Sequence, residues 1–239
     1  MRPDGRKNSE LRPVRITRGF TSAPPGSVLI EMGRTKVLCT ASIADGVPDF
    51  LAGSEQGWIT ADYSMLPGST PTRKEREINR GRPEGRTQEI RRIIGRSLRA
   101  AVDLAQLGPR SLWIDCDVLE ADGGTRTASV TGGFVALVDA LRRLQEQGAI
   151  GRLPIRHFVA AVSVGIVNGQ AALDLCYEED CNAAVDLNLV MTDAGEIVEV
   201  QGTGERCTFA PAELQRLVHL GWKGIRKLLD CQRRALAER

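Results

Sequence analysis

The chain has 239 residues, enough for one or two closely packed units around a sizeable core. Hydrophobic residues make up 42% and charged residues 26%, a balance that excludes a mainly disordered or fibrous protein. The net charge of +2 says little about partners, and no run of eighteen apolar residues predicts a transmembrane helix. Residues 1–8 lack the apolar stretch of a secretory signal, so we expect a cytoplasmic protein.

The residue types present exclude several classes of enzyme. The six cysteines form no CxxC pair and show no zinc-ribbon spacing. The two histidines, His157 and His219, are too few for a multi-histidine metal centre, and neither lies in a context typical of a serine–histidine triad. There is no GxxxxGK[ST] motif and no GxGxxG after a predicted strand, which excludes P-loop and dinucleotide-binding enzymes.

The first third of the chain predicts β-strands. β-Branched residues and turn signals indicate four of them: Val14–Phe20, Ser27–Met32, Thr35–Ile43 and Gly57–Met65. Gly33-Arg34 separates the second strand from the third, which is typical of a hairpin turn. Residues 66–86 are polar and rich in Gly, Pro and Arg, and a loop of this length suggests function or mobility.

Helical spacing replaces the strand pattern from Thr87 onward. Apolar residues recur every three or four positions from Ile90, with arginines between them. Thr87 is the expected N-cap of this helix, and Gly108-Pro109 is its expected stop. Three further elements follow: a strand over Leu112–Leu119, a tight loop over residues 122–126, and a helix from about Ala128 to Gln147.

The second half of the chain partly repeats this organisation. The expected elements are strands over Phe158–Val167, Ala171–Tyr177, Ala183–Met191 and Glu196–Val200, and a basic helix from Pro211 to Arg239. Asn168-Gly169 predicts a hairpin like the one at Gly33-Arg34. The similarity of the two predicted hairpins is a weak indication of two similar halves, because any two hairpins could produce it. We predict an α+β architecture, with no linker rich enough to separate independent domains.

Two predicted loops place an arginine just before a helix start, in Gly85-Arg86-Thr87 and in Gly124-Thr125-Arg126. A cation at a helix N-terminus opposes the helix dipole, and a bound anion removes the conflict. Gly124 lets the backbone approach closely, and Thr125 adds a hydroxyl donor. One such arginine alone could be a solvated surface residue, but two in one chain favour a phosphate site.

A pair of carboxylates could hold a divalent cation. Alternation through residues 184–190 places Asp186 and Asn188 on one face of a predicted strand. An Asp in an otherwise apolar strand needs a partner, because burying an unpaired charge is costly. With Asp180 from the preceding loop, Asp186 could bind Mg²⁺ together with a substrate phosphate. A structural salt bridge to an arginine would explain the same residues, and the sequence favours neither reading.

Positive charge is concentrated in residues 72–99, which include ten basic and four acidic residues. Such a segment suits a polyanion better than a membrane. Its loop, Thr72–Arg82, contains no aromatic residue, so it could meet RNA phosphates but could not stack bases. A solvated surface, or ion pairs between subunits through Glu75 and Glu77, would explain the same loop.

Several long strings resemble the bacterial ribonuclease PH family, and together they span nearly the whole chain. They are Arg2–Arg6, Leu11–Ile16, Gly57–Pro67, Gly85–Ile90, Ile94–Ala100, Asp115–Thr127, Leu173–Asp180 and Val198–Thr203. One position departs from the family pattern, since residue 120 is commonly Gln there and is Glu here. An added negative charge near the phosphate loop would weaken anion binding unless Glu120 points away or pairs with an arginine.

The resemblance implies a single ribonuclease PH domain over residues 1–239, with two similar βαβα halves at roughly 10–150 and 151–239. That fold is related to ribosomal protein S5 domain 2. The resemblance also implies a homohexamer built as a trimer of dimers. The implied activity is phosphate-dependent, 3′-to-5′ removal of nucleotides from RNA, chiefly at the 3′ ends of tRNA precursors. Inorganic phosphate is the co-substrate and nucleoside 5′-diphosphates are the products.

The resemblance also assigns roles to residues. Phosphate binding falls on Arg86, Gly124, Thr125 and Arg126; Mg²⁺ on Asp180 and Asp186; RNA on Arg73 and Arg76; and catalysis on Arg86, Arg126, Asp180 and Asp186. Two alternatives remain. A non-catalytic RNA-binding ring subunit should have lost these groups, and a hydrolytic nuclease would leave both arginine loops unexplained.

Overall fold

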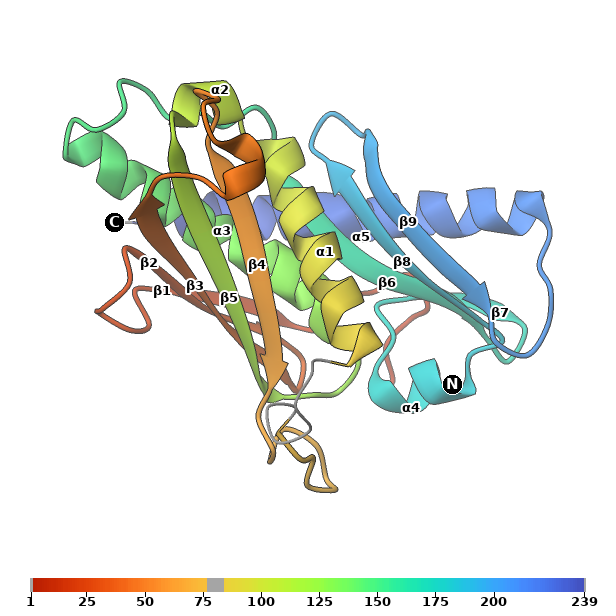
Figure 1. Ribbon diagram of the computed structural model, residues 1–239. Helices are drawn as coiled ribbons and strands as arrows, with labels where there is room; N and C mark the ends of the chain where they lie inside the picture. Colours follow the sequence, from red (N-terminus) through yellow and green to blue (C-terminus); the bar gives the residue numbers. More distant parts are fainter. Residues whose placement is uncertain (1, 77–83, 239) are drawn as a thin grey trace.

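Two β-sheets with helices between and around them make up the fold (Figure 1). The computed structural model describes residues 2–76 and 84–238. The first sheet has the order β1-β2-β3-β5-β4, with bounds β1 Val14–Arg18, β2 Gly26–Met32, β3 Thr35–Asp45, β4 Trp58–Met65 and β5 Arg110–Glu120. All its neighbouring strands are antiparallel except β4 and β5, which are parallel and connected through a helix. A short 3-10 helix, Asp49–Leu51, precedes β4.

The second sheet is antiparallel and has the order β7-β6-β8-β9. Its strands are β6 Val159–Val167, β7 Gln170–Leu173, β8 Val185–Thr192 and β9 Ile197–Gly204. The predicted hairpins at Gly33-Arg34 and Asn168-Gly169 are confirmed, since β2 pairs with β3 and β6 pairs with β7. The two sheets lie on either side of residue 150 in sequence, and the exact boundary of the halves stays a prediction.

Five helices complete the described fold: α1 Gly85–Ala101, α2 Leu104–Leu107, α3 Thr125–Glu146, α4 Tyr177–Asn182 and α5 Pro211–Ala237. Helix α3 packs between the two sheets, against β2, β3 and β6, and α5 covers the second sheet (Figure 1). Over residues 2–76 and 84–238, none of these helices combines the length and apolar character needed to cross a membrane.

The core forms around α3, which is apolar on nearly every side because both sheets contact it. Phe134 and Leu137 are fully buried there. A Cβ on Gly132 would lie 2.6 Å from Cγ2 of Ile30, so this glycine lets the helix approach β2 closely. In β3 every second side chain points toward the helix, including Val37 and Cys39, as the alternation of a half-buried strand requires.

Both central helices begin earlier than the sequence predicts. Helix α1 begins at Gly85 after the N-cap Glu84, and α3 begins at Thr125 after the N-cap Gly124, so Thr87 is not a cap. Neither cap residue makes a side-chain capping bond, and the usual signal for a helix start is therefore missing. As a result Arg86 and Arg126 lie inside the first turns, each as the second helical residue, and not before the helices.

Other boundaries also differ from the prediction. Helix α1 ends at Ala101, before the predicted stop at Gly108-Pro109, because Val102 turns extended and bridges to Ile155. The strand predicted over Ala171–Tyr177 ends at Leu173, and α4 begins at Tyr177. Between them Asp174 adopts a φ of 56°, which breaks the strand.

The N-terminal segment is tied to the second half by buried ion pairs. Arg12 Nη2 lies 2.6 Å from Oδ1 of Asp174, with both side chains nearly fully buried. Arg2 Nε lies 2.6 Å from Oε1 of Glu179, the residue whose other oxygen accepts the backbone N–H of Cys176 at the start of α4. Arg12 also donates to the backbone carbonyl of Asp122, which connects this network to the loop that precedes α3.

We predict that Arg12→Leu lowers the free energy of unfolding by about 3–5 kcal/mol, because Asp174 would remain buried with much of its charge uncompensated. Denaturant unfolding measures the change. Arg15→Leu is the matched control: its side chain is 77% exposed and lies 3.9 Å from Glu31, so it should change stability by less than about 0.5 kcal/mol. Equal stability of the two variants would contradict the assignment.

Candidate active site

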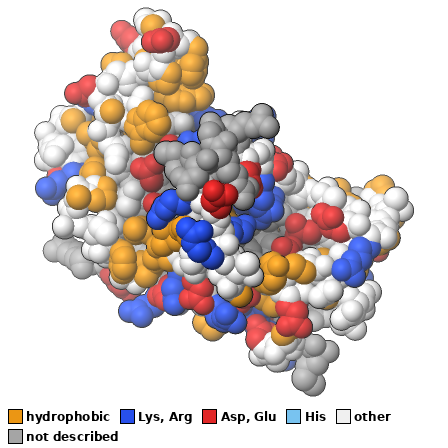
Figure 2. Space-filling model, turned by 60° about the horizontal axis from the view of Figure 1, so that its bottom comes forward, with side chains coloured by type: hydrophobic (Ala, Val, Ile, Leu, Met, Phe, Trp, Pro, Cys, Tyr) orange, Lys and Arg blue, Asp and Glu red, His pale blue; other side chains and the backbone are white. Residues whose placement is uncertain are grey.

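The four predicted catalytic side chains line one pocket of about 490 Å³. Arg86 comes from α1, Arg126 from α3, Asp180 from α4 and Asp186 from β8. The first turn of α1 and helix α4 both lie toward the lower side of the molecule in Figure 1. That side is turned forward in Figure 2, where Lys and Arg side chains lie beside Asp and Glu side chains.

The two arginines occupy equivalent places at the starts of two helices. Each is the second residue of its helix, where backbone N–H groups have no partner within the helix and the dipole is positive. Burial lowers the pKa of Arg126, and the nearby charge of Arg86 lowers it further. A guanidinium nevertheless stays protonated, so the pocket holds two repelling cations at two positive helix ends. An anion with several oxygens would relieve both conflicts.

Gly124 and Thr125 support this arrangement from behind the pocket. Gly124 has a φ of 67°, and a Cβ at the preceding Gly123 would lie 2.6 Å from the carbonyl oxygen of Leu175. Both glycines are therefore required by the turn and by the close approach of the chain before α4. The Thr125 hydroxyl is buried and lies 2.8 Å from Oη of Tyr63, and the side chain does not line the pocket in the described structure.

The two carboxylates line the same pocket as the arginines, and both have raised pKa values. Burial and the charge of Asp180 raise the pKa of Asp186 to about 6. Burial also raises the pKa of Asp180, against the opposing effect of Arg126 and Arg86. Asn188 Nδ2 donates to Oδ2 of Asp186 at 3.3 Å.

These carboxylates fit a divalent cation better than a structural salt bridge. Oδ1 of Asp186 is buried without a hydrogen-bond partner, and within residues 2–76 and 84–238 neither Asp180 nor Asp186 lies within 4.0 Å of a basic group. Two carboxylate oxygens facing a phosphate site are the donor set that Mg²⁺ uses with substrate phosphate. No cluster of three or more His, Cys, Asp or Glu side chains suited to a metal occurs in the described part of the chain.

Arg73 and Arg76 lie beside this pocket and not in it. They line a neighbouring cavity of about 470 Å³ over the end of β4. Arg86 lines both cavities, so the two spaces meet at its side chain. The remainder of the predicted RNA-binding loop, residues 77–83, lies outside the described residues.

Glu120, the departure from the resemblance, lies outside the pocket and has its charge balanced elsewhere. Glu120 does not line the pocket, and its carboxylate lies 2.9 Å from Nζ of Lys36 and 3.6 Å from Nε of Arg34. These two cations lower the pKa of Glu120, so its negative charge is balanced locally.

Sequence reasoning missed several pocket residues, among them Gln201 of β9 and Glu89 of α1. Gln201 accepts a hydrogen bond from Arg126 and donates one to Glu89. Gln201 belongs to a string that resembles the ribonuclease PH family, but neither residue carries a local signal of its own. The contact between them joins positions 112 residues apart, which no local pattern predicts.

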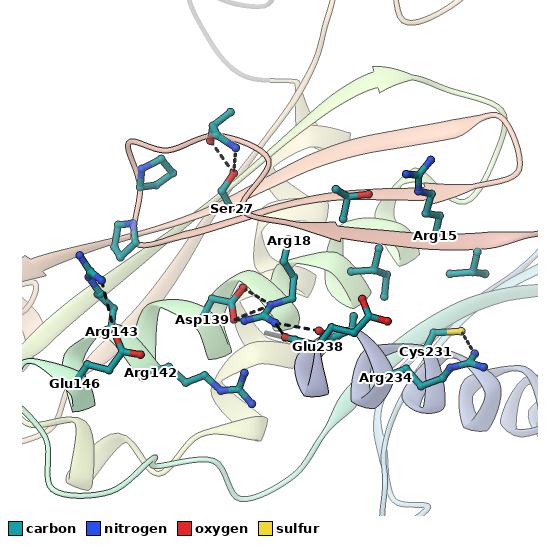
Figure 3. A pocket seen from close by; sticks show the side chains of 18 residues that line it. Arg15, Arg18, Ser27, Asp139, Arg142, Arg143, Glu146, Cys231, Arg234 and Glu238 are labelled. Atoms are coloured by element: carbon teal, nitrogen blue, oxygen red, sulfur yellow. Dashed lines mark hydrogen bonds and ion pairs between the residues drawn. The ribbon is translucent and has the colours of Figure 1, made fainter.

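A larger cavity, of about 940 Å³, lies elsewhere and is explained by structure (Figure 3). Its cations are engaged with the end of α5 and with α3. Arg18 Nη2 lies 2.8 Å from Asp139, and its Nη1 donates to the carbonyl of Ala235. Arg142 donates to the carbonyl of Leu236 at 2.8 Å. Cations that donate to the last carbonyls of a helix satisfy hydrogen-bond acceptors that have no partner within the helix. The groups expected of a phosphate site line the smaller pocket instead.

Comparison with known proteins places this geometry in a family. The chain matches the 3′ exoribonuclease family in both of its domains, domain 1 over residues 10–142 and domain 2 over residues 157–224. The chain belongs to the 3′ exoribonuclease family. Its fold is the ribonuclease PH fold with mixed α and β content, as the resemblance implies, and the family describes this fold as two domains.

Solved structures have the same fold at low sequence identity. Rice (Oryza sativa) Rrp46 is 20% identical with a TM-score of 0.79, over 98% of this chain and 100% of that chain. An Archaeoglobus fulgidus exosome with RNA bound to the active site is 24% identical with a TM-score of 0.81, over 96% and 91%. An archaeal exosome core is 23% identical with a TM-score of 0.77, over 97% and 91%. At these identities the likeness establishes the fold.

We predict that Asp186→Asn stabilises the metal-free protein above pH 6. The folded pKa of Asp186, about 6, lies above the ordinary value of 3.8, so ionising it costs folding free energy. The stability difference between variant and parent should be absent below about pH 4, open up between pH 4 and 6, and reach about 1–3 kcal/mol above pH 6.

Denaturant unfolding in a chelator, repeated across this pH range, measures the difference. Asp45→Asn, at the exposed end of β3, is the control and should stay within about 0.5 kcal/mol of the parent throughout. A loss of stability in Asp186→Asn at pH 7.5 would show that the carboxylate has a favourable partner.

Proposed function

We propose that this protein is a phosphorolytic 3′-to-5′ exoribonuclease of the bacterial ribonuclease PH type. It uses inorganic phosphate to remove the last nucleotide of RNA as a nucleoside 5′-diphosphate, and it trims the 3′ ends of tRNA precursors in the cytoplasm. Membership of the 3′ exoribonuclease family supports the cleavage of RNA from this end. The resemblance in sequence supports the phosphorolytic activity and the tRNA substrate.

The convergence of Arg86 and Arg126 on one pocket, each from the first turn of a helix, carries the proposal. A hydrolase has no use for a second anion site, whereas phosphorolysis needs one for the attacking phosphate. In this assignment both guanidinium groups bind inorganic phosphate, and the backbone at Gly124 and Thr125 offers N–H donors from the helix start.

The chemistry then needs little beyond position and charge. A phosphate oxygen attacks the last internucleotide phosphorus, and the bond from that phosphorus to the 3′ oxygen of the shortened chain breaks. The 3′ oxygen takes a proton and becomes a hydroxyl, while the terminal nucleotide leaves as a diphosphate. Because one phosphate linkage replaces another of similar energy, the reaction also runs in reverse and adds nucleotides from nucleoside diphosphates.

Asp180 and Asp186 are the residues that would hold Mg²⁺. When bound, the cation would balance negative charge on the phosphates and orient them. Without the cation, Asp186 would have a second role open to it, since a carboxyl with a pKa of about 6 can exchange a proton near neutral pH. The arginines would fix the phosphate in the same pocket.

Arg73 and Arg76 would guide RNA toward the pocket through the cavity that meets it at Arg86. Their charges suit backbone phosphates, and neither can read a base by stacking. A homohexamer built as a trimer of dimers is the assembly that we propose, on the basis of the resemblance.

We predict that a 3′-extended tRNA with Mg²⁺ releases nucleoside diphosphates only when inorganic phosphate is present. Identification of the released mononucleotides by chromatography is the measurement. Monophosphates released without phosphate would mean a hydrolase. No release under either condition would favour a non-catalytic ring subunit.

In the same assay, Arg86→Ala should lower kcat/KM for phosphate by about 100-fold or more, because one of two charged donors to the phosphate is lost. Arg92→Ala is the matched control, an exposed arginine of the same helix outside the pocket, and should behave as the parent. Full activity of Arg86→Ala at low phosphate concentration would refute the phosphate site.

The double variant Arg73→Ala/Arg76→Ala should bind tRNA more weakly and reduce the slope of log affinity against log salt by about 2. Binding titrations at several salt concentrations measure this slope. Lys223→Ala/Arg226→Ala, two cations of α5, is the control. An unchanged slope for the first variant, or an equal loss in the control, would contradict RNA binding by this loop.

A further inference from the structure

A chain of hydrogen bonds crosses the floor of the pocket from α3 to α1. Arg126 Nη1 donates to Oε1 of Gln201, and Nε2 of Gln201 donates to Oε1 of Glu89. Arginine only donates and a carboxylate only accepts, so these neighbours fix which way the amide of Gln201 points. The guanidinium of Arg126 is therefore held in one direction by a group on the other half of the molecule.

In this series of hydrogen bonds, the negative charge of Glu89 is separated from Arg126 by the amide of Gln201. A carboxylate is the commoner partner of a buried guanidinium and would hold it more strongly. It would also cancel much of the charge of Arg126, which lines the pocket together with Arg86 and Arg206. An amide fixes the side chain without placing a negative charge in direct contact with it, so the guanidinium stays available for an anion. The charge of Glu89 acts on Arg126 from beyond that amide, at a longer distance than a direct contact would have.

We propose that Gln201 is a positioning residue that holds Arg126 for phosphate through an uncharged contact, with Glu89 fixing the amide. This inference rests on the proposed function, because it assumes that phosphate binds at Arg126. The proposal predicts that the affinity for phosphate depends on whether the carboxylate is at position 89 or at position 201, even when the net charge and the number of hydrogen bonds stay the same.

A simpler role would be to fasten α1 to β9. A second contact serves that purpose without touching the pocket: Arg96 Nη1 of α1 lies 2.5 Å from Oε2 of Glu199 on β9. Neither residue lines the pocket. Glu199→Gln weakens this second link between the same two elements and is the matched control.

The double variant Gln201→Glu/Glu89→Gln tests the proposal. It reverses the chain, since the new carboxylate at position 201 can accept from Arg126 and the new amide at position 89 can donate to that carboxylate. The negative charge then contacts Arg126 directly. We expect the KM for phosphate to rise about tenfold, with kcat at saturating phosphate changed less than about threefold. Calorimetric titration with inorganic phosphate alone should show the same loss of affinity. Glu199→Gln should match the parent in both measurements.

A double variant that folds and binds phosphate like the parent would overturn the proposal, as would an equal loss of affinity in Glu199→Gln. If the double variant does not fold, Gln201→Leu decides: it removes the amide that holds Arg126, so the KM for phosphate should rise while Glu199→Gln keeps the value of the parent. An unchanged KM for phosphate in Gln201→Leu would overturn the proposal. Failure of the proposed function is distinguishable, because the parent itself would then show no phosphate-dependent release of nucleotides.

Discussion

The packing of α3 between the two sheets is the constraint on which the rest of the molecule depends. Its side chains fill the core from both sides, and Gly132 brings its axis close to β2. The helix cannot shift without opening both sheets, so its first turn is fixed where α4 and β8 of the second half come near α1 of the first. The position of Arg126 in one pocket with Asp180 and Asp186 follows from the core.

The candidate site is electrostatically unfavourable in the absence of ligands. Two cations lie at positive helix ends, and two carboxylates with raised pKa values line the same pocket. Groups perturbed by burial and like charges are typical of functional sites, where a ligand supplies the missing opposite charge. Stability comes from elsewhere, from the apolar core and the buried pairs of the N-terminal segment. Cavity size is a poor guide here, since the larger space beside α5 is lined by arginines that already have partners.

Local patterns in the sequence predict most strands, both hairpins and four of the side chains that line the pocket. They fail where structure depends on distant partners. The start of α4 relies on Glu179, which Arg2 holds from 177 residues away, and no local periodicity reveals a helix of six residues. The pattern places the starts of α1 and α3 too late because Glu84 and Gly124 form no side-chain cap. Gln201 and Glu89 meet only after both halves have assembled.

The N-terminal segment constrains the order in which contacts can form during synthesis. Arg2 and Arg12 are made before their partners Glu179 and Asp174, which lie 177 and 162 residues later in the sequence. Closing so long a loop costs entropy before any contact repays it. Because Arg12 contacts both Asp174 and the carbonyl of Asp122, the full set of contacts around the turn that starts α3 requires residues up to 174. A nascent chain can thus build its first sheet early, but it completes the candidate site only after the second half has been made.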